Sequence, residues 1–465
     1  MPKRNLFVLL MMIAVAGVAW LARDRAGHGR RFAEVLGAIE RTYFEPVDQQ
    51  RLFDAAMEGV FSRLDDHSAF VVGDRRDQLE RLLDQEFGGV GLELAESEGG
   101  RGITVVSPVF GSPAWRAGIA AGDRILAIDG FPTQQMAIDD ALRRLRGRPG
   151  TPVRLSMAVS SSSDAVVDAA GAPPRDLAIV REVVKTESVL GDRRRQDGSW
   201  EWSIEGDPTA TIIRITSFGE RTADELRRAL EAIESRMADD GQQPAEERQE
   251  AGGVLVLDLR GNSGGLLSAA VEVCDIFLDD GVIVSTRGRA ARDAGRAGDA
   301  AAALDVRRAT RGAACADLPM AVLVDGLTAS AAEVVAACLQ DHGRAIVVGS
   351  RSFGKGTVQS IVPLSDGSGL VKLTSAEYLR PSHVNIHRHG DDDGNAAWGV
   401  SPDDGCTLTP TGRQIESLQV WRRLRDVVPA KGGARVPNEP ESHAVMPRHV
   451  DPVLAKAVDV VRERD

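Results

Sequence analysis

The sequence predicts a multidomain α+β protein with an N-terminal helical region, a small β-rich domain and an α/β core. Three observations support this prediction. Apolar residues recur at helical spacing between residues 30 and 82. Short β patterns crowd into residues 87–185, and after residue 202 continuous apolar strands alternate with helices. A length of 465 residues also suggests about three domains.

In the helical region, residues 27–86, Pro46 separates two amphipathic segments, and we expect a packing role for them. In the β-rich domain, residues 87–185, we expect short helices after Ser112 and at 138–145 and an exposed loop at 160–174. The strands of this domain are expected at residues 90–94, 103–106, 124–128, 153–157 and 177–183.

The core is expected to span residues 186–430, followed by a tail, 431–465, with a terminal helix at 451–464. Three continuous apolar runs indicate strands buried on both faces: Val254–Leu259, Ala321–Val324 and Ile346–Val348. Helices follow the first two runs, so the pattern predicts a parallel sheet. Residues 357–364 and 370–379 alternate and predict two further strands.

Composition excludes several classes of protein. Lys and Arg number 56 against 68 Asp and Glu, and a net charge of −12 lacks the basic surface of a general nucleic-acid binder. Hydrophobic residues at 43% and charged residues at 27% exclude wholesale disorder. The four cysteines are too few for a disulfide scaffold and lack zinc-finger spacing.

Residues 1–26 predict a signal sequence or membrane anchor. Lys3 and Arg4 precede an apolar run, Leu6–Leu21, and charged residues follow it. The run is near the lower length that spans a bilayer, so we favour an uncleaved anchor over a cleaved signal or a buried soluble helix. The positive-inside bias then places the rest of the chain outside the cytoplasm, as in a bacterial periplasm.

Ser330 follows a predicted strand and begins a predicted helix. Serine there is most often a helix N-cap, but the helix N-terminus would also stabilise an oxyanion next to a nucleophile. Lys355 lies between Gly354 and Gly356; either it belongs to a solvated turn, or burial lowers its pKa and it serves as a base. Gln359 follows on the next strand, within possible reach of the amine.

Two glycine-rich segments offer backbone amides, although ordinary tight turns explain each of them equally well. Arg260–Gly265 follows a buried strand and could present one N–H group to an oxyanion. Phe87–Leu92 leads into a strand and could capture a peptide carboxylate. Gly349 to Lys355 partly matches a phosphate-binding P-loop, but the required Ser or Thr and the following helix are missing.

Together these segments resemble the C-terminal processing peptidases, or tail-specific proteases, from about residue 30 to the end of the chain. Ser263 and Ala332 stand where the family more often has Pro and Ser. The segments that carry the resemblance are Tyr43–Val47, Leu64–Ser68, Phe87–Gly91, Gly111–Ala114, Ala117–Ile119, Gly122–Leu126, Ile128–Gly130, Leu145–Thr151, Asp258–Gly265, Thr328–Glu333 and Phe353–Gln359.

The resemblance implies a PDZ domain and an α/β crotonase-like catalytic core. It further implies Ser330 as nucleophile, Lys355 as general base and Gln359 as the residue that orients Lys355. The amides of Gly265 and Ala331 would form the oxyanion hole. Those of Val90, Gly91 and Leu92 would bind the substrate's terminal carboxylate.

The sequence therefore predicts an anchored, extracytoplasmic serine endopeptidase without metal or organic cofactor. Its substrates would be proteins with unstructured apolar C-terminal tails, and nucleic acid is not an expected partner. A homo-oligomer or an activating partner stays open. The alternative is a catalytically idle PDZ scaffold that binds C-terminal tails, against which the intact Ser330, Lys355 and Gln359 argue.

Overall fold

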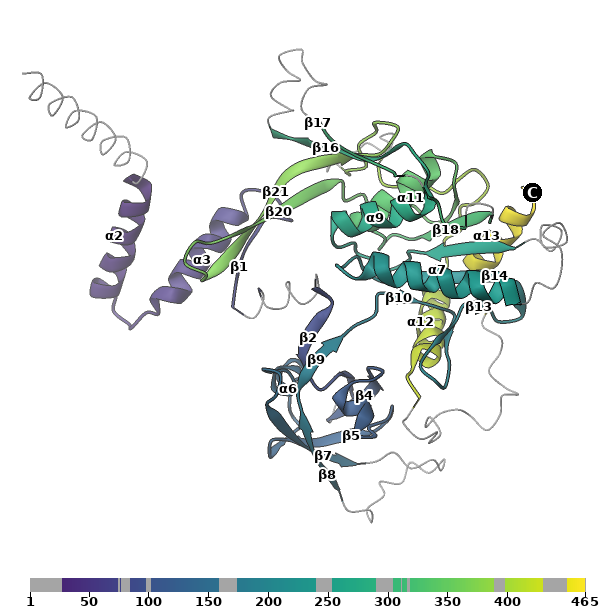
Figure 1. Ribbon diagram of the computed structural model, residues 1–465. Coiled ribbons are helices and arrows are strands. Elements are labelled where there is room, and N and C mark those ends of the chain that lie inside the picture. The colour runs from purple at the N-terminus through teal and green to yellow at the C-terminus, as the bar shows by residue number, and fades with distance from the viewer. Residues whose placement is uncertain are drawn as a thin grey trace, which may run out of the picture. The chain divides into compact units, whose positions relative to one another are not determined.

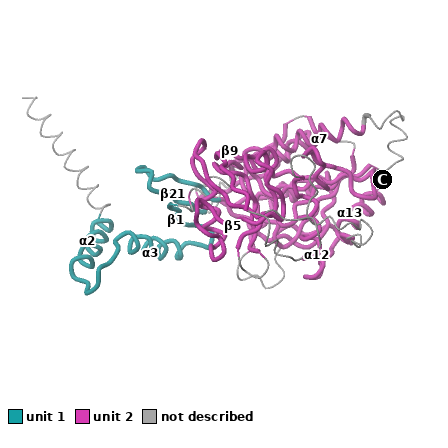
Figure 2. The backbone as a smooth tube through the Cα atoms, turned by 90° about the horizontal axis from the view of Figure 1, so that it is seen from below, with its two compact units in different colours: residues 1–73, 359–374 teal, residues 74–358, 375–465 magenta. Residues whose placement is uncertain are grey.

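The computed structural model describes residues 27–73, 76, 84–97, 102–158, 174–239, 253–289, 304–310, 312–315, 318–388, 398–429 and 450–464. The chain divides into two compact units, residues 1–73 with 359–374 and residues 74–358 with 375–465 (Figure 2). The predicted signal or anchor, residues 1–26, lies outside the described residues. Among the described residues, no helix is both long and apolar enough to span a membrane.

Residues 27–73 of the first unit form helices α2 (Gly27–Thr42) and α3 (Gln49–Phe61) and strand β1 (Ala69–Val72). Asp48 caps α3 by accepting a hydrogen bond from the Gln50 N–H at 2.9 Å. Residues 69–72 were expected to be helical, but they pair antiparallel with residues 369–372. Phe70 explains the difference, since its ring packs against Phe53 and Phe61 of α3 instead of continuing a helix.

The small β-rich domain lies in the second unit, and its five expected strands and two helices are present. Its sheet has the order β3-β4-β5-β7-β8, with β3 at an edge. Residues 86–89 form a further strand that pairs with residues 182–185, where the sequence suggested a loop. The elements are β2 (Glu86–Gly89), β3 (Leu92–Glu96), β4 (Ile103–Pro108), α5 (Pro113–Arg116), β5 (Arg124–Ile128), β6 (Phe131–Pro132), α6 (Ile138–Leu145), β7 (Pro152–Ala158), β8 (Arg175–Val180) and β9 (Glu182–Lys185).

The core of the second unit is built on the parallel strands β14, β15, β18 and β19, in that order. This confirms the parallel sheet predicted from the apolar runs. Figure 1 labels β14 and β18 of this sheet. The strands and helices on this sheet are β10 (Val189–Leu190), β13 (Ser203–Ile204), β14 (Asp207–Ile215), α7 (Thr222–Asp239), β15 (Val254–Asp258), α9 (Leu267–Phe277), β18 (Met320–Val324), α11 (Ala331–Asp341), β19 (Ile346–Gly349) and α13 (Pro452–Arg462).

Alternate residues of each central strand enter two different clusters. Leu255 and Leu257 of β15 pack with α7, α9 and α11 on one face, while Val254 and Val256 pack with α13 on the other. A strand covered on both faces needs a continuous apolar run, which is why the sequence showed one. The terminal helix α13 is thus part of the core.

The remaining elements do not belong to this sheet or to its covering helices. Residues 376–379 of β21 pair with β16, and β16 pairs with β17. Helix α12 was not expected, since its polar sequence has no clear apolar face. These elements are β11 (Arg193–Arg194), β12 (Trp200–Glu201), β16 (Val282–Gly288), β17 (Leu304–Arg308), β20 (Thr357–Pro363), β21 (Gly369–Leu379) and α12 (Gly412–Asp426), with β20 and β21 beginning or ending in the first unit.

A buried charge cluster fixes the end of β15 to α13. Arg260 donates to both carboxylate oxygens of Asp258, at 3.0 and 2.7 Å, and to Asp451, at 3.0 and 2.6 Å. Arg422 of α12 joins Asp258 from a third element. Burial alone would raise the pKa of Asp258 and Asp451, but the two arginines outweigh it and lower the pKa of both carboxyls.

We expect Asp451→Asn to lower the free energy of unfolding by about 3 kcal/mol, because it leaves a buried arginine partly unpaired. Carboxyls whose folded-state pKa is lowered stabilise the fold above their unfolded pKa of about 3.9 and lose that effect as pH falls further. Urea unfolding at several pH values should therefore show that the free energy of unfolding of the wild type decreases below about pH 4. This decrease should be smaller in the variant. Equal stability at neutral pH would contradict this, and exposed Asp305→Asn is the control.

Candidate active site

Ser330 joins β18 to the first turn of α11 in a strained backbone conformation. Its φ of +57° and ψ of −119° are unusual for a residue with a side chain. Such strain persists only where surrounding contacts enforce it, and it is concentrated at functional sites. The position is that of a helix N-cap, as the sequence suggested, but the geometry favours more than a capping role.

Glu333, in the first turn of α11, holds Ser330 and the segment before Lys355 together. Its side chain is fully buried. One carboxylate oxygen, Oε2, accepts hydrogen bonds from the N–H groups of Ser330 and Lys355, each at 2.8 Å. The other, Oε1, accepts from the Gly354 N–H at 2.6 Å and from the Ser352 hydroxyl at 2.5 Å. Two segments more than twenty residues apart therefore converge on one side chain.

Burial makes the Glu333 carboxylate costly to ionise and raises its pKa, while the four donors act in the opposite direction. The N-terminus of α11 also favours a negative charge at this place. An ionised carboxylate has only acceptor sites, so it can accept all four of these hydrogen bonds at once. Glu333 is thus suited to fix these backbones in one arrangement.

The backbone around half-buried Lys355 is held by close packing as well as by Glu333. A Cβ atom on Gly356 would lie 2.4 Å from the backbone nitrogen of His387, so only glycine fits there. The Phe353 N–H donates to the Thr328 carbonyl at 2.9 Å, next to the Ser330 turn. The backbone of this segment is therefore held by its neighbours, and the role of Lys355 as a base stays a prediction.

The turn after β15 brings Gly264 and Gly265 against Ser330. A Cβ on Gly264 would lie 2.8 Å from the Ser330 Cβ and 3.0 Å from the Ala331 nitrogen. Gly265 has a φ of +146°, and a Cβ there would lie 2.0 Å from the Phe218 carbonyl oxygen. The Gly264 N–H donates to the Asn262 side chain at 2.8 Å, and the Leu266 N–H donates to the Phe218 carbonyl at 2.7 Å. The amide of Ala331 follows Ser330 at the start of α11, which makes an oxyanion site at this junction chemically reasonable.

Tyr378 of β21 was missed by the sequence analysis, because no motif marks it. Its hydroxyl donates to the Ser330 Oγ at 3.1 Å, and its N–H donates to the Gly356 carbonyl at 3.0 Å. Burial raises the pKa of the phenol far above its ordinary value, and the charge of Glu333 adds to that effect. Tyr378 therefore contacts the candidate nucleophile as a neutral donor.

Gln359 belongs to the first unit, whereas Ser330 and Lys355 belong to the second. Its side-chain amide donates to the Thr374 hydroxyl at 3.4 Å, and Thr374 in turn donates to Asp65 at 3.1 Å. The motif at residues 64–68 thus supports the strand segment that pairs with Gln359's strand. The orientation of Lys355 by Gln359 stays a prediction.

In the small domain, Val90, Gly91 and Leu92 lead into edge strand β3. Gly91 has a φ of +78°, and a Cβ there would lie 2.3 Å from the Ser112 Cβ. Its carbonyl accepts from the Val109 N–H at 3.0 Å and from the Ser112 hydroxyl at 3.2 Å. The turn is thus firmly held beside an edge to which a peptide strand could add.

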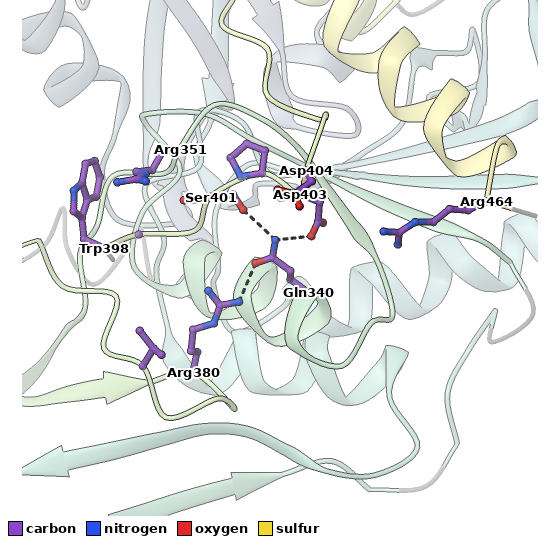
Figure 3. Close-up of a pocket in the computed structure, with 11 residues that line it drawn as sticks. Gln340, Arg351, Arg380, Trp398, Ser401, Asp403, Asp404 and Arg464 are labelled. Atoms are coloured by element: carbon purple, nitrogen blue, oxygen red, sulfur yellow. Dashed lines mark hydrogen bonds between the residues drawn. The ribbon is translucent and has the colours of Figure 1, made fainter. Parts of the chain in front are cut away.

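A pocket of about 430 Å³ lies at the opposite end of α11, lined by Gln340, Arg380 and Trp398 among others (Figure 3). Gln340 donates to the Ser401 carbonyl at 3.0 Å and accepts from Arg380 at 2.9 Å. Ten residues of helix, about 15 Å, separate Gln340 from Ser330. This pocket is therefore distinct from the Ser330 region.

Two family models match the chain: Peptidase family S41 over residues 209–404 and PDZ domain over residues 104–158. The carboxy-terminal-processing protease of Bartonella bacilliformis is 35% identical over 360 residues, covering 77% of this chain and 73% of that protein. The chain belongs to the carboxy-terminal-processing proteases of peptidase family S41.

A second relative agrees with this assignment. The carboxyl-terminal-processing protease of Synechocystis sp. is 31% identical over 352 residues, covering 76% of this chain and 72% of that protein. A solved photosystem II D1 C-terminal processing protease aligns over 90% of this chain and 96% of its own, with 26% identity and a TM-score of 0.41. The protein is a serine-type peptidase with a PDZ domain, which confirms the resemblance inferred from its motifs.

We expect Glu333→Gln to lower kcat by roughly 10²-fold, because an amide cannot accept from both pairs of donors and the Ser330 and Lys355 backbones would shift. Peptide hydrolysis by the folded variant measures this effect. The matched control is Glu225→Gln, since Glu225 is also a buried carboxylate near a helix start, accepting from Ser188 and Val189. Equal kcat losses in the two variants would contradict a specific role for Glu333.

Proposed function

We propose that the protein is an endopeptidase in which Ser330 attacks the substrate and Lys355 is the general base. The observation that carries this proposal is the shared acceptor Glu333, which ties the Ser330 turn to the Lys355 backbone. A neutral lysine amine would take the Ser330 proton as Oγ attacks the carbonyl carbon. The same proton would then pass to the leaving amine, and water would hydrolyse the acyl-enzyme.

The amides of Gly265 and Ala331 are proposed to donate to the oxyanion of the tetrahedral intermediate. Their support is the close approach of the Gly264–Gly265 turn to Ser330 and the start of α11. Preorganised backbone donors of this kind need no rearrangement during the reaction. Gln359 is proposed to orient the Lys355 amine, on the family resemblance alone.

For recognition, we propose that the PDZ domain binds unstructured apolar C-terminal tails. The amides of Val90, Gly91 and Leu92 would receive the terminal carboxylate, and the tail would add as a strand to β3. The support is that β3 is an edge strand and that α6 packs near it. The remaining chain would extend from this point toward Ser330.

The test is to mix the full chain, in mild detergent, with a protein that bears a flexible apolar tail and to follow intact masses. Wild type should cleave the tail, whereas folded Ser330→Ala and Lys355→Ala should lose activity by at least about 10³-fold. The wild-type rate should fall in acid, because a protonated lysine cannot accept the serine proton. Cleavage by Lys355→Ala at the wild-type rate would remove Lys355 as the base. Tail binding without cleavage by any of them would favour the idle scaffold.

We also propose that residues 1–26 anchor the protein in the cytoplasmic membrane with its catalytic part outside the cytoplasm. The support is the basic pair followed by the apolar run. We expect the chain to stay in the membrane fraction after an alkaline carbonate wash and to be digested by protease added to spheroplasts. Protection from that protease, with a cytoplasmic marker also protected, would contradict the proposed orientation.

A further inference from the structure

The side-chain hydroxyl of Tyr378 donates a hydrogen bond to the Ser330 Oγ at 3.1 Å. The contact lies on the atom that would react, so it is not explained by packing alone. Tyr378 is 3% exposed, and its ring enters the same apolar cluster as α9 and α11. A buried phenol is normally placed where its hydroxyl finds a partner, and here that partner is the nucleophile.

Two elements fix the position of this phenol. The backbone of Tyr378 pairs with Thr286 of β16 in an antiparallel ladder. The Tyr378 N–H also donates to the Gly356 carbonyl, one residue beyond Lys355. The strand that carries the phenol is therefore hydrogen-bonded directly to the Lys355 segment.

We propose that Tyr378 is a catalytic residue that donates a hydrogen bond to the Ser330 Oγ whenever negative charge develops on that oxygen. The inference rests on the proposed function of Ser330 as nucleophile and deepens it. A hydrogen bond to a charged acceptor is roughly twice as strong as one to a neutral acceptor. The contact therefore stabilises the transition state more than the resting enzyme.

Charge develops on the Oγ twice in each turnover. During acylation, the Oγ–carbon bond forms as the serine proton goes to the Lys355 amine, and the amine returns that proton to the leaving nitrogen as the carbon–nitrogen bond breaks. During deacylation, Lys355 takes a proton from water as water attacks, and the carbon–Oγ bond breaks with the proton going to the Oγ. Tyr378 keeps its own proton throughout and supplies only the hydrogen bond.

The surroundings of the phenol suit a permanent donor. Burial and the nearby Glu333 charge raise the pKa of Tyr378, so it does not ionise in the working pH range. It cannot replace Lys355 as the base. Removal of the hydroxyl should therefore lower the rate without moving the pH at which the lysine gains its proton.

Tyr378→Phe tests the inference, since it keeps the ring and removes the hydroxyl. We expect kcat for tail cleavage to fall roughly 10²-fold, with KM and the midpoint of the acid limb unchanged. Single-turnover acylation and deacylation should both slow. Tyr43→Phe is the matched control, because the chain has two tyrosines and Tyr43 is exposed. Wild-type kcat in folded Tyr378→Phe would overturn the inference, whereas a wild type without Ser330-dependent cleavage would remove the proposed function as well.

A second measurement covers the case in which Tyr378→Phe does not fold. Biosynthetic 3-fluorotyrosine in Tyr43→Phe protein places a single fluorine label at residue 378. The ¹⁹F resonance should shift when a fluorophosphonate modifies Ser330 and also in the Ser330→Ala background, because the acceptor of the phenol changes in both. A resonance that responds to neither change would overturn the contact and with it the inference.

Discussion

One buried carboxylate, Glu333, holds the Ser330 turn and the Lys355 segment of this protease together. It accepts the backbone N–H groups of Ser330, Gly354 and Lys355 and the hydroxyl of Ser352. A buried acceptor with four donors resists displacement, because each donor it lost would be left unsatisfied in the interior. The Ser330 N–H makes its bond to Glu333 from a backbone conformation that residues with side chains rarely adopt.

The parallel sheet provides the frame on which this arrangement depends. The turn that carries Gly265 follows β15, and the turn that carries Ser330 follows the neighbouring strand β18. Carboxyl ends of neighbouring parallel strands meet at one edge, where α/β proteins place their functional loops. The ion pairs of Arg260 with Asp258 and Asp451 connect that edge of the sheet to the start of α13. The active-site geometry is therefore supported by the last helix of the chain.

Local patterns in the sequence were sufficient for part of this picture. The continuous apolar runs predicted the parallel strands, and the motifs around Ser330 and Lys355 predicted the family. Helix α12 was missed although Thr411 and Gln414 form a capping box at its start, because its polar sequence shows no clear apolar face. Residues 69–72 and 86–89 were not predicted, because their partners lie far away in the sequence: an aromatic cluster and strand β9. In these segments tertiary contacts outweigh local propensity.

The two residues that complete the site were also beyond sequence reasoning. Glu333 stands three positions after Ser330, where an acidic residue indicates an ordinary capping box. Its additional donors come from residues 352–355, which no local pattern connects to α11. Tyr378 lies in an alternating strand pattern, where an aromatic residue indicates only that the position is buried. The packing of β21 brings its hydroxyl to Ser330.

Amide hydrogen exchange can show whether Glu333 holds the Ser330 turn and the Lys355 segment as one unit. In the wild type, the amides of Ser330, Gly354 and Lys355 should exchange slowly and with similar protection. In Glu333→Gln, all three should exchange faster together, while the amides of the central strand β15 keep their protection. Rapid exchange of these amides in the wild type would contradict this role of Glu333. So would a variant in which the amides of only one of the two segments exchange faster.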